Sequence, residues 1–143
     1  MAKINPYLTF NGNCEEAMTF YKAVFGTEFS YVGRFSDFPD ESKNMPGVRP
    51  EQIMHMTMPI SKETVLMACD NPRPQEKVVF GQHLSLSVTA ESKEEADKLF
   101  NGLASGGAIA MPITNTFWNA YFGMLVDKFG VLWMINYEFA TKE

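Results

Sequence analysis

The chain has 143 residues, the length of one ordinary domain that can bury a core of its own. Its formal net charge is −5, and the charged residues are scattered rather than clustered. A mildly acidic chain without a basic stripe or a polybasic patch is not expected to bind nucleic acid or a membrane surface.

The sequence also indicates a compartment. No run approaches the roughly 20 consecutive apolar residues of a membrane span, and residues 1–5 lead into a strand-like run without a secretory leader. The two cysteines, Cys14 and Cys69, are too few for a disulfide framework. We therefore expect a cytoplasmic protein in which both thiols are reduced and serve packing.

The first half of the chain has the pattern of a strand, a helix and three further strands. The strand Tyr7–Phe10 leads to a polar turn, where Asn13 and Glu16 have the spacing of a helix-capping box. Gly26 is suited to the left-handed residue that ends a helix. Between them, one helical face is apolar: Ala17, Phe20, Tyr21 and Val24. The next three strands are predicted at residues 27–35, 52–59 and 64–70.

The second half repeats this pattern. A strand at residues 83–88 precedes a capping box of Ser92 and Glu95, and the helix ends near Gly106 and Gly107. Its apolar face has the same spacing as that of the first helix: Ala96, Leu99, Phe100 and Leu103. The last three strands are predicted at residues 108–113, 117–126 and 131–137.

The order βαβββ therefore occurs twice, in modules of about residues 1–71 and 82–143. The linker 72–81 contains Pro72 and Pro74, which exclude a helix and a central strand. The proline-containing loop 36–50 is predicted as a solvent loop, in preference to an active-site lid. We predict a single α+β domain: two βαβββ modules that form a curved mixed sheet, with helices on its outer face and a groove inside.

Alternation along a strand assigns side chains to the two faces of the sheet. The apolar positions of the two opening strands are expected under the helices: Ile4, Leu8, Phe10, Leu84, Leu86 and Val88. The opposite faces are then polar and look into the groove: Asn5, Tyr7, Thr9, His83, Ser85, Ser87 and Thr89. Such a surface suits both a site for a polar small molecule and a solvated sheet face.

Motifs at the opening, middle and close of the chain together carry a family resemblance. They are residues 4–10, Asn13, residues 16–17, 20–21, 24–26, 53–56, 65–67, 117–118, 121–123 and 127–131, and Trp133. These motifs resemble PhnB-like proteins of the vicinal oxygen chelate superfamily, which has the glyoxalase/bleomycin resistance fold. The resemblance implies the paired βαβββ fold, usually as a homodimer. Such proteins are often labelled 3-demethylubiquinone-9 3-methyltransferases.

The resemblance also implies where a metal would bind. Enzymes of the superfamily hold a divalent ion through His and Glu side chains on the first and last strands of each module, where it acts as a Lewis acid. Here these positions carry Asn5, Met67, His83 and Met134, so that only His83 matches. One imidazole and two soft thioethers do not suit a hard divalent ion, and we predict no cofactor. The alternative is a divalent metal site that recruits Glu138 or pairs His55 with His83.

The tryptophan and methionine side chains can serve either a site or ordinary packing. Trp118 is predicted either to stack on a ligand or to lie at a dimer interface. Trp133 is expected beneath a helix, and the strand methionines are expected to fill the core rather than bind copper. The candidate groove residues are Asn5, Tyr7, Thr9, His55, Met67, His83, Ser85, Trp118 and Met134.

Three functions compete. The first is a metal-independent protein that binds an unidentified small molecule, and the second is a metal-dependent lyase, isomerase, dioxygenase or thiol transferase. The third is a methyltransferase, which we disfavour because no glycine-rich strand-to-helix turn is present to hold S-adenosylmethionine. The fold alone does not decide among them, since one fold hosts many chemistries.

Overall fold

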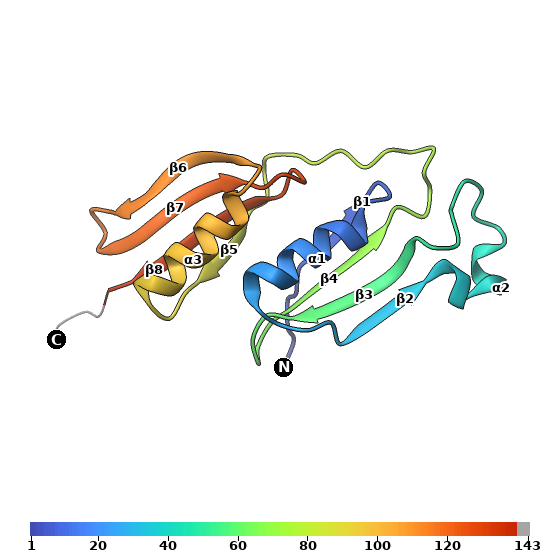
Figure 1. The fold of residues 1–143 in the computed structure, drawn as a ribbon, viewed down its shortest axis with the longest axis horizontal. Coiled ribbons are helices and arrows are strands. Elements are labelled where there is room, and N and C mark those ends of the chain that lie inside the picture. Colours follow the sequence, from blue (N-terminus) through green and yellow to red (C-terminus); the bar gives the residue numbers. More distant parts are fainter. Residues whose placement is uncertain (140–143) are drawn as a thin grey trace. The chain divides into compact units, whose positions relative to one another are not determined.

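The computed structural model describes residues 1–139 of the chain (Figure 1). These residues form two compact units, unit 1 from Met1 to Val79 and unit 2 from Phe80 onward. Both units follow the predicted order of one strand, a helix and three strands, and unit 1 adds two short helical turns. Within the described residues, no helix is long and apolar enough to cross a membrane.

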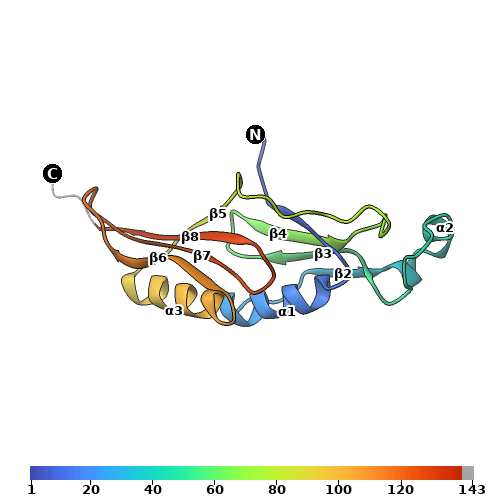
Figure 2. The same cartoon turned by 90° about the horizontal axis from the view of Figure 1, so that it is seen from above.

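Unit 1 is a mixed four-stranded sheet with α1 packed on one face (Figure 2). Its sheet order is β1-β4-β3-β2, in which β1 is parallel to β4 and the other neighbours are antiparallel. Its elements are β1 (Tyr7–Phe10), α1 (Cys14–Phe25), β2 (Tyr31–Arg34), η1 (Phe35–Asp37), α2 (Pro39–Ser42), β3 (Ile53–Pro59) and β4 (Val65–Asp70). The buried side chains include Phe10, Cys14, Ala17, Met18, Tyr21, Met56, Met58, Leu66 and Ala68.

Unit 2 repeats this topology, with the sheet order β5-β8-β7-β6 and α3 on one face. Its elements are β5 (Leu86–Thr89), α3 (Lys93–Ala104), β6 (Ala108–Asn115), β7 (Ala120–Val126) and β8 (Leu132–Glu138). The four predicted apolar residues of the helix are all buried, as is Trp133. The α+β class with two βαβββ modules is therefore confirmed, and so is the packing of Trp133.

The two helices begin differently from each other. Ser92 caps α3 as predicted, because its side chain accepts a hydrogen bond from the Glu95 backbone N–H at 3.0 Å. The predicted cap at Asn13 is wrong, since its side chain makes no capping bond. Instead Asp70, at the end of β4, accepts the Cys14 backbone N–H at 2.9 Å. A carboxylate from a neighbouring strand thus satisfies the free donor of the first turn.

Three strands begin later than predicted. β7 begins at Ala120 because a tight turn precedes it, in which the Thr116 N–H donates to the Ala120 carbonyl at 2.8 Å. Asn119 in this turn has a φ of 64°, a left-handed conformation that asparagine tolerates better than most residues. The strand prediction that included Trp118 is therefore wrong, and Trp118 lies in the turn. β2 begins only at Tyr31.

The opening strand of unit 2 is also shorter than predicted. β5 pairs with β8 only from Leu86 onward, so His83 and Ser85 precede the strand. Alternation of faces does not extend beyond the paired residues. Leu84 is accordingly 69% exposed rather than buried, and Ile4, which precedes β1, is 96% exposed. The prediction that both lie under the helices is wrong.

Residues 36–50 are mostly exposed, as expected of a solvent loop, but the segment contains helical turns that we did not predict. It continues η1 and contains the short helix α2, which has Pro39 at its first position, where proline is well accommodated. Phe35, at the start of η1, is 2% exposed and anchors the segment in unit 1.

Candidate functional site

One face of the unit 1 sheet is turned away from α1 and carries most of the unit 1 candidates. The register pairs Tyr7 with Met67 and Thr9 with Cys69, and β3 adds Thr57 opposite Met67. The alternate residues of the same strands, such as Ala68 and Met56, are buried on the helix side. We call the residues on this face, which are exposed or partly buried, the polar face of unit 1: Tyr7, Thr9, Tyr31, His55, Thr57, Met67 and Cys69.

His55 alternates with Thr57 on this face, and an irregularity in β3 separates it from Ile53. The pairing of β2 with β3 shifts from Gly33–His55 to Arg34–Ile53, so that Met54 is an extra residue. Such a bulge changes the face on which the neighbouring side chains lie. Ile53 is therefore fully buried although simple alternation placed it with His55.

Two tyrosine rings lie beside the imidazole of His55. The hydroxyl of Tyr7 lies 2.9 Å from Nδ1 of His55, and the two rings are stacked with centroids 5.5 Å apart. Tyr31 approaches the imidazole from β2, at a centroid distance of 5.9 Å. Both tyrosines are nearly half exposed, at 45% for Tyr7 and 44% for Tyr31. The cluster thus presents aromatic surface that the described chain does not cover.

The Tyr7–His55 contact orients the imidazole. Burial, followed by the adjacent Cys69 thiol, raises the pKa of Tyr7 above its usual range, so the phenol keeps its proton at neutral pH. It can then donate to Nδ1, which leaves the proton of a neutral imidazole on Nε2. Within residues 1–139, Nε2 of His55 has no hydrogen-bond partner and is not fully buried. Nε2 is therefore the ring nitrogen of His55 that is left for another partner.

The corresponding face of unit 2 carries Met134. Met134 pairs with Ser87 on one side and with Met124 on the other. Trp118 is 51% exposed in the turn before β7, with its ring 5.7 Å from that of Phe122. Glu138 is an exposed residue at the end of β8.

The residues at the expected metal positions do not fit a divalent ion. Asn5 Oδ1 already accepts the Val65 backbone N–H at 3.0 Å, a bond that fixes the start of β4. Met67 and Met134 offer only soft thioethers, and His83 lies in an exposed bend. Among residues 1–139, no three His, Cys, Asp or Glu side chains are grouped so that they could hold one metal ion.

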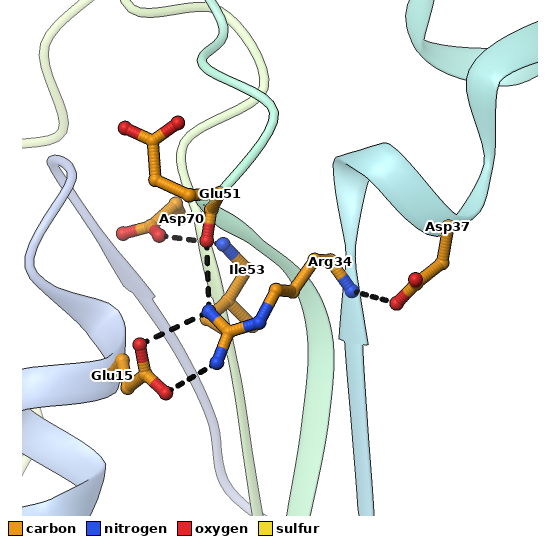
Figure 3. Close-up of polar contacts among 6 residues, drawn as sticks. All are labelled: Glu15, Arg34, Asp37, Glu51, Ile53 and Asp70. Atoms are coloured by element: carbon orange, nitrogen blue, oxygen red, sulfur yellow. Dashed lines mark hydrogen bonds and ion pairs between the residues drawn. The ribbon is translucent and has the colours of Figure 1, made fainter.

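A second polar cluster lies at the end of β2 (Figure 3). Arg34 donates to both carboxylate oxygens of Glu15, at 3.0 and 2.6 Å, and to the Glu51 carbonyl at 2.9 Å. The Arg34 backbone N–H donates to Asp37 at 2.8 Å. These bonds tie the first turn of α1 to β2 and to the segment before β3, and therefore support the bulge beside His55.

The sequence did not single out this cluster, or Tyr31 and Thr57. All of them depend on the pairing of β2 with β3, which joins residues that are far apart in sequence. Tyr31 lay in a predicted strand, but the strand's register, and hence its neighbours, is not readable from a single sequence.

Glu15 gives a prediction about pH. The hydrogen bond from Arg34 lowers the pKa of Glu15, so the pair stabilises the fold above the carboxylate's ordinary pKa and loses this contribution as the pH falls through the lowered value. We expect Glu15→Gln to cost at most about 1 kcal/mol at pH 7, because the pair is largely exposed, and to be neutral near pH 3. Urea unfolding at the two pH values measures the difference.

Glu16→Gln is the matched control, since Glu16 lies in the same helical turn and makes no ion pair with Arg34. A cost for Glu15→Gln that persists unchanged at pH 3 would contradict an ionic role for the pair.

Solved structures share this architecture. A glyoxalase/bleomycin resistance protein/dioxygenase family enzyme from Burkholderia phytofirmans PsJN superposes with a TM-score of 0.62 at 17% identity, covering 96% of this chain and 97% of that one. The chain thus has the glyoxalase/bleomycin resistance fold. The family model for 3-demethylubiquinone-9 3-methyltransferase matches residues 2–136. The chain belongs to this PhnB-like family, as the motifs predicted.

Similar proteins are known from several bacteria. Protein YjdN of Escherichia coli (strain K12) is 34% identical over 140 residues, 93% of each chain. The structure of protein PA1353 from Pseudomonas aeruginosa matches with a TM-score of 0.84 at 40% identity, covering 96% of this chain and 98% of that one. The PhnB protein from Bacillus cereus gives 0.77 at 35% identity, covering 95% and 99%.

Proposed function

We propose that the chain is a small-molecule binding protein of this family, that its ligand lies on the polar face of unit 1, and that binding needs no metal ion. The observation that carries the proposal is the Tyr7–His55–Tyr31 cluster, in which two half-exposed rings flank an imidazole with an outward donor. Ligand sites typically combine such aromatic surface with a few placed polar groups.

The metal-free part of the proposal depends on the donor set. The oxygen of Asn5 is engaged with the backbone, and the thioethers of Met67 and Met134 do not match hard divalent ions. A methyltransferase activity receives no support from the turn between β1 and α1, which contains the single glycine Gly12. We further propose that the protein is cytoplasmic and that it forms a homodimer. The dimer is proposed because large apolar side chains such as Ile109 and Phe117 are exposed in the single chain.

The test uses protein dialysed against EDTA, with residual metal measured by elemental mass spectrometry and assembly by native mass spectrometry. A fragment library of uncharged compounds is then titrated while the backbone amides are followed by NMR. We expect saturable shifts at β1, β3 and β4 that do not change when Zn²⁺, Mn²⁺ or Ni²⁺ is added. His55→Ala should weaken the binding that these shifts report by about three- to tenfold, and His83→Ala should leave it unchanged.

Two results would overturn the proposal. In the first, about one equivalent of metal copurifies with the chain, and both metal and ligand binding are lost in His83→Ala. In the second, every saturable shift maps outside the polar face of unit 1. Binding of S-adenosylmethionine in a calorimetric titration would support the methyltransferase hypothesis instead.

A further inference from the structure

We propose that the polar face of unit 1 selects an uncharged aromatic ring that carries a hydrogen-bond acceptor, with the ring stacked at the Tyr7–His55–Tyr31 cluster and the acceptor on Nε2 of His55. This inference rests on the proposed function and narrows the ligand to a chemical class.

The aromatic part follows from the rings. Tyr7 comes from β1, His55 from β3 and Tyr31 from β2, so the cluster spans the sheet, and Tyr7 reaches across Met67 of β4 to its partner. Rings attract one another in offset or edge-to-face arrangements beyond the effect of buried area alone. Met67 adds a polarizable thioether, which also favours contact with a ring.

The absence of charge is the second argument. The side chains of the polar face are phenols, hydroxyls, a thioether, a thiol and one imidazole, with no carboxylate, ammonium or guanidinium among them. The ion pairs found among the described residues of unit 1 lie elsewhere, as that of Arg34 with Glu15 does. A ligand with a formal charge would lose water on this surface without gaining a partner of opposite charge. The surface therefore disfavours anions and cations alike.

The acceptor is the third argument. In this proposal the Tyr7 hydroxyl, 2.9 Å from Nδ1, is the donor, so that the proton of a neutral His55 imidazole lies on Nε2. An unpaired donor that a ligand covers is costly unless the ligand supplies an acceptor. A carbonyl or phenol oxygen, or a ring nitrogen, in the plane of the ligand would meet this requirement. Tyr7 is thus a positioning residue for His55.

The test compares three probes of similar size in NMR titrations of the EDTA-dialysed chain: 2-naphthol, its saturated counterpart decahydro-2-naphthol, and the anion 2-naphthoate. We expect 2-naphthol to shift the amides around His55 and Tyr31 saturably. The other two should bind about tenfold more weakly, because one loses ring contacts and the other brings an unmatched charge.

Variants locate the effect. His55→Ala and Tyr31→Leu should each weaken 2-naphthol binding by about three- to tenfold, whereas Phe117→Leu, which removes an exposed ring in unit 2, should not. In Tyr7→Phe, the ¹⁵N shifts of the His55 ring should change from a single Nε2–H tautomer to a mixture. Backbone spectra that overlay with those of the native chain establish that each variant is folded.

The outcomes separate the two proposals. Equal binding of decahydro-2-naphthol, tighter binding of 2-naphthoate or of naphthyltrimethylammonium, or an unchanged His55 tautomer in Tyr7→Phe would overturn the ligand class. If library compounds shift the amide signals of the polar face but no naphthalene probe does, the proposed ligand class is overturned and the proposed function stands. If no compound shifts the polar face, both fail.

Discussion

Replacing Asp127 by alanine is expected to lower the free energy of unfolding by about 3–5 kcal/mol, because three donors lose their acceptor and each stranded buried donor costs roughly 1–3 kcal/mol. Asp127 is 3% exposed in the turn between β7 and β8. Its carboxylate accepts the backbone N–H groups of Phe129 and Val131, at 2.8 and 3.1 Å, and the Trp133 indole N–H at 2.8 Å. One side chain therefore holds both the turn and the buried indole.

Urea unfolding followed by tryptophan fluorescence measures this loss. The background variant Trp118→Phe leaves Trp133 as the single reporter, since the chain has two tryptophans. Asp127→Asn is the matched control, because its amide oxygen can still accept part of the set, and it should lose clearly less stability than Asp127→Ala. A cost below about 1 kcal/mol for the alanine variant would mean that water replaces the carboxylate in the turn.

Asp70→Ala is expected to cost about 2–4 kcal/mol and also to disturb the polar face of unit 1, because two buried donors lose their acceptor. Asp70 is 2% exposed and accepts the Cys14 N–H at 2.9 Å. It also accepts the Ile53 N–H at 2.8 Å (Figure 3). The first bond begins α1, and the second holds Ile53 in the bulge of β3, two residues before His55. Denaturant unfolding gives the cost, and hydrogen exchange at the amides of β3 reports the disturbance.

The control for this prediction is Asp37→Ala. Asp37 also accepts a backbone N–H, that of Arg34, but at an exposed site, so its loss should cost roughly 1 kcal/mol or less. If Asp70→Ala is no worse than Asp37→Ala, or if the exchange of the β3 amides is unchanged, Asp70 does not hold the bulge.

The parts of the fold that depend on local periodicity could be predicted. The helical face of α3, from Ala96 to Leu103, is buried as its spacing indicated, and the strand β1 has the predicted bounds. Along α1 the fit is looser, because Met18 is fully buried where we expected Phe20. The rotation of a helix about its own axis, which decides which side chains meet the sheet, is set by the surface of the sheet. Periodicity along the helix does not describe that surface.

The parts that depend on pairing could not be predicted. Tyr31 reaches His55 only because β2 lies beside β3 in one register, and a bulge moves Ile53 to the other face. The capping of α1 by Asp70 joins residues 56 positions apart. The site candidates Tyr7 and His55 were recognised singly, but their hydrogen bond was not.

The pairing of the first strand with the fourth has a consequence for the order of folding. Tyr7 lies opposite Met67, so this ladder can form only after the intervening chain has been drawn into a closed loop. The β3–β4 hairpin closes a far shorter loop and carries a smaller entropic cost. We therefore expect His55 and Met67 to be in place on the hairpin before Tyr7 arrives, so that the last strand to join unit 1 completes the ring cluster.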